Sequence, residues 1–192
     1  MQTITRSIAI AGASLATRHV GDGAPVLLVH GVPGDWESLA PVADRLAASC
    51  HAITVSLRYA GPGPHGMRGF GTAEQRDDLR DLIGALGLGP VHLVAWSYSA
   101  HAALALAADH PERVRSLMVY EPGFPTCLED DDERQAVQHD MGAAFGPVFA
   151  ALGQGDEGEA RRRGRGAPPL HRRRSGQGRM VRRPAGARAG DP

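Results

Sequence analysis

The sequence contains no lysine, and it is poor in other features that would place it in a special class of protein. Two of its 192 residues are cysteine, Cys50 and Cys127, too few for a disulfide framework or a cysteine-based metal centre. No apolar run approaches the roughly 20 residues needed to span a bilayer, and residues 1–16 alternate like a strand rather than a signal peptide. We therefore expect a cytoplasmic protein with no membrane partner.

Net charge is also lacking, because two oppositely charged segments cancel. Residues 1–160 carry 10 arginines against 20 acidic residues, a net charge of −10. Residues 161–192 carry 11 arginines against Asp191 alone, a net charge of +10. Such an asymmetry indicates that two segments of different character are joined in one chain.

Apolar periodicity up to residue 120 predicts strands that alternate with helices. Residues 7–20 read as a hairpin with its turn at Gly12, and Thr72 with Gln75 reads as a helix-opening capping box. Further strands are expected at 25–29, 52–57, 91–95 and 114–120. Helices are expected at 36–48, 72–86 and 99–110. This alternation predicts an α/β fold with a mostly parallel sheet flanked by helices.

The most informative segment runs from a buried strand through Ala95-Trp96-Ser97-Tyr98-Ser99 directly into a helix. It resembles the nucleophile elbow of the α/β-hydrolases, G-x-S-x-G, a strained turn that holds a serine above the sheet. Both glycines of that pattern are replaced here, by Ala95 and Ser99, which are among the smallest residues available. The resemblance implies that Ser97 is a nucleophile.

A second motif, His30-Gly31-Val32-Pro33-Gly34, follows the first buried strand and resembles the oxyanion loop of the same family. Read alone, Gly31 and Gly34 would indicate an ordinary turn. The family resemblance implies that His30 and Gly31 belong to the loop. It also implies that the backbone amides of Val32 and Tyr98 stabilise the oxyanion that forms during acyl transfer.

A serine nucleophile needs a base, and the family places an acid and then a histidine late in the chain. Glu121, at the end of the strand after the elbow helix, is the candidate acid; the alternative is a residue that packs or lines the pocket. No histidine follows a final strand, and each of the candidates lies elsewhere: His30, His65, His92, His101, His110, His139 and His171. We therefore expect a truncated enzyme, incomplete at its C-terminal end, with weak or no activity.

Three regions are predicted. Residues 1–125 form the hydrolase core, and 126–160 the helical start of a lid, with a helix over 135–152 interrupted near Gly146-Pro147. Residues 161–192 lack apolar periodicity and are expected to be disordered. We favour a frameshift in a GC-rich gene as the origin of this Arg-rich tail. The alternative is a genuine tail that binds nucleic acid or acidic surfaces.

The resemblance implies hydrolysis of a small ester or related acyl substrate, with no metal and no organic cofactor. Haloalkane dehalogenases and epoxide hydrolases of this fold use an aspartate nucleophile, so a serine at position 97 argues against both. The small-molecule substrate is the expected partner, and nucleic acid is expected only if the Arg-rich tail is genuine. A non-catalytic protein that binds through this tail is the alternative function.

Overall fold

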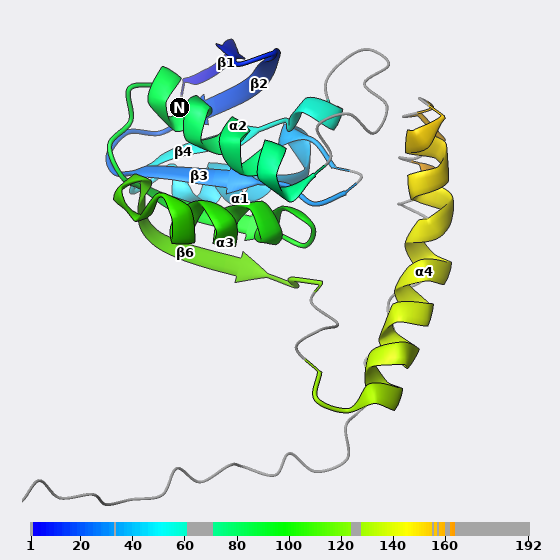
Figure 1. Ribbon diagram of the computed structural model, residues 1–192. Coiled ribbons are helices and arrows are strands. Elements are labelled where there is room, and N and C mark those ends of the chain that lie inside the picture. Colours follow the sequence, from blue (N-terminus) through cyan, green and yellow to red (C-terminus); the bar gives the residue numbers. More distant parts are fainter. Residues whose placement is uncertain are drawn as a thin grey trace, which may run out of the picture.

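A computed structural model describes residues 2–32, 34–60, 71–123, 128–154, 156, 158–159 and 162–163 (Figure 1). Its strands are β1 Thr3–Ile10, β2 Ala13–Val20, β3 Pro25–Val29, β4 His51–Val55, β5 Val91–Trp96 and β6 Val114–Tyr120. Its longer helices are α1 Ala40–Leu46, α2 Thr72–Ala85, α3 Ser99–Asp109 and α4 Asp131–Gly153.

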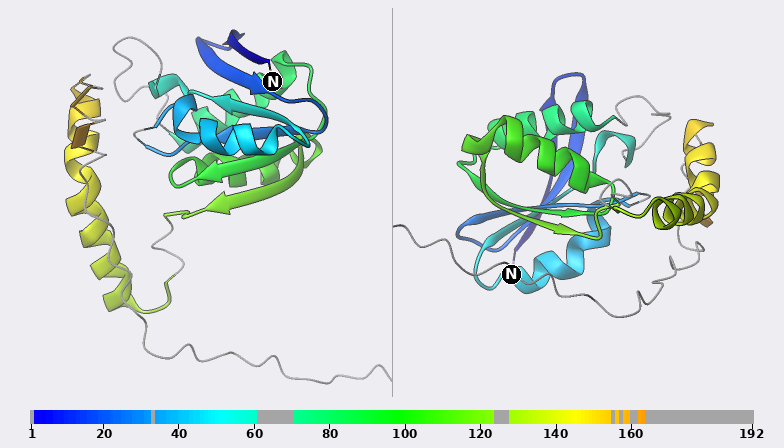
Figure 2. Two further views of the ribbon diagram at one scale, coloured as in Figure 1. Left: turned by 180° about the vertical axis from the view of Figure 1, so that it is seen from behind. Right: turned by 60° about the horizontal axis from the view of Figure 1, so that its bottom comes forward.

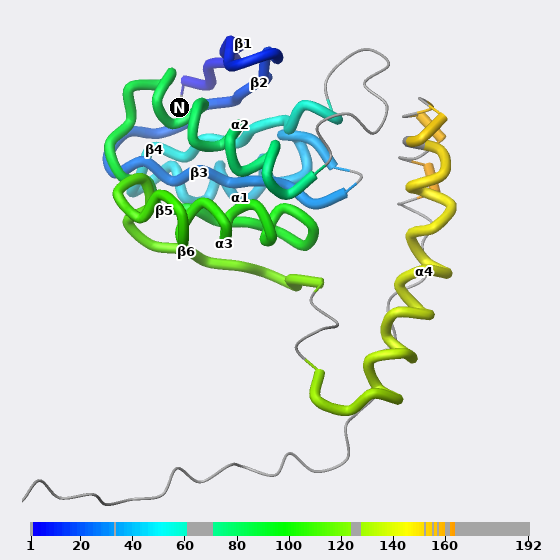
Figure 3. Tube along the Cα trace, viewed as in Figure 1, coloured from blue at the N-terminus to red at the C-terminus, as the bar shows by residue number. Residues whose placement is uncertain are grey.

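The six strands form one sheet in the order β1-β2-β4-β3-β5-β6, which can be followed along the trace in Figure 3. Strands β3, β4, β5 and β6 run parallel, whereas the β1–β2 hairpin is antiparallel and joins the sheet through β2 and β4. Parallel neighbours require crossover connections, and helices provide them here. The structure therefore confirms the predicted α/β class.

Helices cover both faces of the sheet, with α2 and α3 on one face and α1 on the other (Figure 2). Alternation along β3 shows this directly, because Leu27 and Val29 pack in the cluster under α2 and α3 while Leu28 packs under α1. All three side chains are fully buried. The uninterrupted apolar run of β3 is thus explained by burial on both faces.

Strand β6 forms one edge of the sheet, and no described strand pairs with its outer side. Met118 and Tyr120 alternate along it on the face opposite α3, with 60% and 54% of their surface exposed. An unpaired edge of this kind is an aggregation hazard.

Two helix predictions are wrong in detail. Helix α2 begins at Thr72, but its N-cap is Gly71 and no side chain caps it, so the predicted capping box is not formed. Gln75, assigned to that box, is instead almost fully buried in the helix interface. Burial of the Gln75 side chain outweighed its local capping preference.

The other correction concerns the predicted break near residue 147. Helix α4 is continuous from Asp131 to Gly153 with Pro147 inside it. A proline removes one backbone donor without forbidding helical φ, so the helix passes through at a cost. The segment 36–48 also divides, into a 3₁₀ turn at Trp36–Leu39 and then α1.

Some predictions fall outside the described residues. They concern the candidate histidines His65 and His171, and Cys127. Of the predicted Arg-rich tail the structure describes Arg162 and Arg163, which form ion pairs with Glu159 in a helical turn.

Candidate active site

The junction between β5 and α3 has the strand, turn and helix predicted around Ser97. Ser97 adopts φ 56°, a left-handed conformation that L-residues rarely occupy. Its amide donates to the carbonyl of Tyr120 at 2.8 Å, and its carbonyl accepts from the Ala100 amide at 3.0 Å. Backbone bonds on both sides therefore hold the partly buried Ser97 in a strained turn between strand and helix.

Small residues at positions 95 and 99 meet the steric demand of this turn. Ala95 and Ser99 are both fully buried. The Ser99 hydroxyl lies 3.1 Å from the carbonyl of Val29 and 3.1 Å from that of Trp96, so its proton is shared between them. Ser99 thereby ties the turn to the end of β3, an interaction that a glycine could not make.

Gly31 brings the second motif against the turn. A Cβ atom at this position would lie 3.0 Å from Cβ of Ser97 and 3.1 Å from the carbonyl oxygen of Trp96. Glycine is therefore needed here for the close approach of two backbones. Segments far apart in the sequence are thus adjacent at the carboxyl edge of the parallel strands.

His30 fastens this loop and is fully buried. Its Nε2 accepts a hydrogen bond from the Leu57 amide at 3.1 Å, so the ring proton of the neutral form lies on Nδ1. Nδ1 is 2.8 Å from the Gly31 carbonyl, to which it donates. With both nitrogens engaged in the backbone, His30 is a structural part of the loop, as its motif predicts.

The two residues expected to supply oxyanion amides flank the same space. Val32 lies in the turn that follows Gly31, and Tyr98 directly follows Ser97 as the residue before α3. Both side chains are partly buried and pack against the main core. Burial raises the pKa of the Tyr98 hydroxyl, with a smaller contribution from Glu74. The role of the two amides as oxyanion donors stays a prediction.

Glu121 lies at the strand end next to that of Ser97. The register pairs Trp96 with Tyr120, so Ser97 and Glu121 each follow the end of adjacent parallel strands. Glu121 also has positive φ, 50°, and its side chain is exposed. No described histidine is hydrogen-bonded to it, and its role as the acid stays a prediction.

A base for Ser97 is not found among the described histidines. His101, one turn into α3, has its Nε2 3.3 Å from the Gly123 carbonyl and its ring 5.8 Å from that of Tyr98. His92 Nδ1 lies 2.7 Å from the Ser116 hydroxyl on the neighbouring strand. In the described part of the chain no histidine is hydrogen-bonded to the Ser97 hydroxyl.

An ion pair supports the loop after β4. The Arg58 guanidinium donates to both carboxylate oxygens of Asp78, a buried residue of α2, and also to the Ala11 carbonyl at 3.2 Å. These bonds with Asp78 raise the pKa of Arg58. Asp78 has no motif around it, and sequence reasoning did not find it.

Helix α4 stands beside the carboxyl edge, in the region expected to begin a lid (Figures 1 and 2). A Cβ on Gly123 would lie 3.1 Å from the terminal methyl of Met141, so α4 contacts the segment that follows Glu121. Val148 and Ala151 of α4 are buried and belong to the main hydrophobic cluster. This helix therefore adds apolar surface near the predicted site.

Across the residues that the structure describes, no group of three or more His, Cys, Asp or Glu side chains is placed to hold a metal ion. Among the same residues no helix is long and apolar enough to cross a membrane.

A family model for the alpha/beta hydrolase fold matches residues 24–157, more than half of the chain. The chain belongs to the α/β-hydrolase fold family. Its match begins just before β3 and includes both motifs of the candidate site as well as α4.

Similar α/β-hydrolases include a soluble epoxide hydrolase from Corynebacterium sp. (strain C12), 29% identical over 106 residues, 54% of this chain and 37% of that protein. A 2-(acetamidomethylene)succinate hydrolase from Mesorhizobium japonicum is 29% identical over 118 residues, 62% and 42% of the two chains. A 2-hydroxy-6-oxo-2,4-heptadienoate hydrolase from Pseudomonas putida is 32% identical over 126 residues, 60% and 44%.

The solved structure of an epoxide hydrolase from Vigna radiata superposes with a TM-score of 0.57 at 26% identity, covering 61% of this chain and 37% of that one. The chain thus spans less than half the length of these relatives.

Proposed function

We propose that this chain carries the nucleophile and oxyanion loop of a serine hydrolase that acts on small esters or related acyl substrates. The observation that supports it is the positive φ of Ser97 at a strand-to-helix junction, with Gly31 packed directly against it. Such a turn holds a side chain above the sheet, and strained backbone conformations of this kind cluster at functional sites.

Serine at the turn distinguishes this chain from the epoxide hydrolases among its relatives. An aspartate carboxylate attacks directly, whereas a serine hydroxyl must first lose a proton and forms an acyl ester with the substrate. We therefore infer acyl transfer rather than epoxide opening. The negative charge that forms on the carbonyl oxygen would be held by the amides of Val32 and Tyr98.

Low turnover is part of the proposal. With no described histidine hydrogen-bonded to Ser97, the hydroxyl would depend on binding and on the oxyanion amides alone. In this proposal Glu121, at the adjacent strand end, is the acid that would orient such a histidine. An added base should therefore restore part of the missing chemistry.

A fluorophosphonate probe with and without added imidazole tests this directly. We expect mass spectrometry to locate the phosphonyl group on Ser97, with labelling accelerated by imidazole and lost when urea unfolds the chain. Ser97→Ala should remove the labelling, while Ser49→Ala, an exposed serine after α1, should retain it. No labelling of Ser97 at any imidazole concentration would overturn the proposal.

A further inference from the structure

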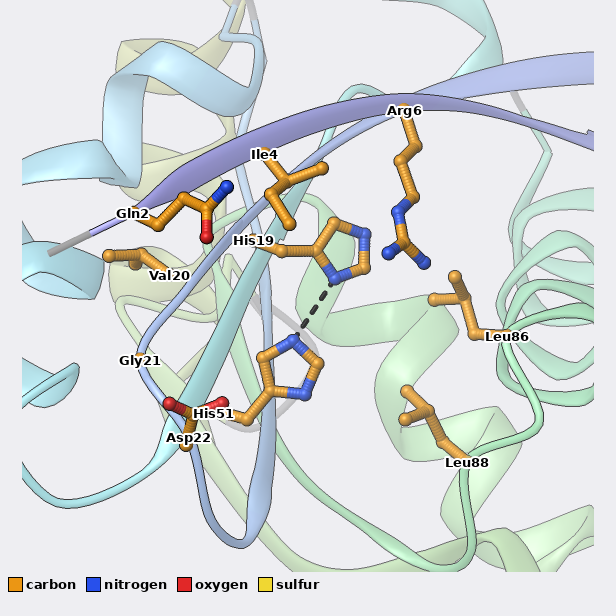
Figure 4. A pocket seen from close by; sticks show the side chains of 10 residues that line it. All are labelled: Gln2, Ile4, Arg6, His19, Val20, Gly21, Asp22, His51, Leu86 and Leu88. Atoms are coloured by element: carbon orange, nitrogen blue, oxygen red, sulfur yellow. Dashed lines mark hydrogen bonds between the residues drawn. The ribbon is translucent and has the colours of Figure 1, made fainter.

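A second polar site lies at the opposite edge of the sheet from Ser97. There, a cavity of about 300 Å³ opens under the C-terminal end of α2, as Figure 4 shows. The residues that line it come from β1, β2, β4 and the segment after α2: Gln2, Ile4, Arg6, His19, Val20, Gly21, Asp22, His51, Leu86 and Leu88.

A relay of hydrogen bonds fixes the protons of the two histidines in this cavity. The Thr17 hydroxyl donates to the Arg6 carbonyl at 3.3 Å, so it accepts from Nε2 of His19 at 3.0 Å. Neutral His19 then has a bare Nδ1, which lies 3.1 Å from Nε2 of His51. His51 therefore donates through Nε2, and its Nδ1 is the nitrogen left to meet a ligand.

His19 is held neutral in this relay. It is almost fully buried, and burial together with His51 and Arg6 lowers its pKa to about 4. The two rings stack at 5.3 Å between centroids, which keeps His51 facing the cavity.

Arg6 supplies a permanent positive charge beside this pair (Figure 4). Arg6 is exposed, and in the described part of the chain no carboxylate forms an ion pair with its guanidinium, whereas Arg18, Arg58 and Arg76 have carboxylate partners. An arginine next to histidines, without a carboxylate of its own, is suited to an anionic ligand. Leu86 and Leu88 form an apolar wall on the other side of the space.

We propose that this cavity binds a small aliphatic carboxylate. Its oxygens would accept from the Arg6 guanidinium, and its short apolar chain would lie against Leu86 and Leu88. Asp22 at the rim is the one acidic group among the lining residues and opposes the anion.

Calorimetric titration of the full chain with sodium butyrate tests the site. Saturable binding is expected. Arg6→Gln should weaken binding by about tenfold or more, since a charge-assisted hydrogen bond is lost. Asp22→Asn should strengthen it, because the opposing charge is removed. Arg45→Gln, on α1 at the other face, is the matched control and should bind as the unchanged chain does.

Butyramide and phosphate separate the outcomes on the unchanged protein. Butyramide has the same shape without the charge, so equal binding of butyramide would overturn the proposal. Tighter binding of inorganic phosphate than of butyrate would overturn the assignment of a carboxylate with an apolar chain. Unaltered butyrate affinity in a folded Arg6→Gln variant would equally exclude the site.

Discussion

The two edges of the parallel sheet both bring residues from separate segments together, but they are built in different ways. At the carboxyl edge, Ser97 and Gly31 belong to two short motifs, each of which already specifies a local conformation. At the amino edge, Arg6, His19 and His51 come from three strands and no motif connects them. One site is therefore encoded locally, and the other arises only from strand register.

Backbone strain also differs between the carboxyl edge and the amino edge. Among the described residues, the two non-glycine residues with positive φ are Ser97 and Glu121, side by side at the carboxyl edge. At the amino edge, positive φ occurs at Gly21 and Gly23, which adopt it without a steric penalty. Strained conformations in folded chains concentrate at functional sites, so this difference favours the carboxyl edge as the place of chemistry.

The largest effect is expected from Gly21→Ala at the amino edge. A Cβ there would lie 2.4 Å from the Cys50 carbonyl oxygen and 2.5 Å from that of Ala47, at φ 75°. Overpacking and backbone strain together should lower the free energy of unfolding by about 3–5 kcal/mol in urea titrations. Gly12→Ala has similar φ, 71°, but open space around it, and should cost only about 1 kcal/mol. Equal losses of stability in the two variants would show that the positive φ, and not the close approach of the neighbouring backbone, determines the cost.

Gly31→Ala at the carboxyl edge should have a smaller effect on stability and a larger one on reactivity. The new methyl group presses on Ser97 and Trp96, which we expect to cost about 1–3 kcal/mol and to abolish probe labelling of Ser97. Gly84→Ala, in α2 with nothing within 4 Å, is the control and should stabilise the chain by about 0.5–1 kcal/mol. Full labelling of Ser97 in the Gly31→Ala variant would contradict the close contact between Gly31 and Ser97.

His19 should make the amino edge sensitive to acid. Because its pKa falls from 6.5 to about 4 on folding, the unfolded chain binds a proton in this interval that the folded chain does not. Stability is therefore complete above pH 6.5 and is lost as the pH falls toward 4, with a slope of up to about 1.4 kcal/mol per pH unit. His19→Gln should flatten this slope in urea titrations between pH 7 and pH 5.

Arg6→Gln tests the contribution of Arg6 to this pH dependence of stability. The Arg6 charge contributes to the lowered pKa of His19, after burial and His51. Its removal should bring the pKa of His19 slightly closer to its ordinary value and reduce the slope a little. An unchanged slope in Arg6→Gln would mean that Arg6 does not act on His19.

The smallest effect is a gain in stability from Ser97→Gly. Glycine adopts φ 56° without strain, so we expect unfolding to require about 1 kcal/mol more than in Ser97→Ala, which keeps the strain. Urea titration of the two variants measures this difference. If Ser97→Gly were no more stable than Ser97→Ala, the turn would store no strain.

Much of the fold could be predicted because the signals are local. Apolar runs placed β3 and β6 at the residues where they lie, and the strand, turn and helix around Ser97 are confirmed. The capping box at Thr72 was wrong because Gln75 is buried by tertiary packing. The break at Pro147 was wrong because a proline weakens a helix without always ending it.

By itself, the sequence determined the α/β alternation and the strand, turn and helix around Ser97. These depend on the period of apolar residues and on side-chain size, which can be read from neighbouring positions. Only the tertiary structure decided that Asp78 pairs with Arg58 and that His19 meets His51 beside Arg6. Such contacts depend on strand order and register, because residues distant in the chain become neighbours only when the whole sheet is assembled.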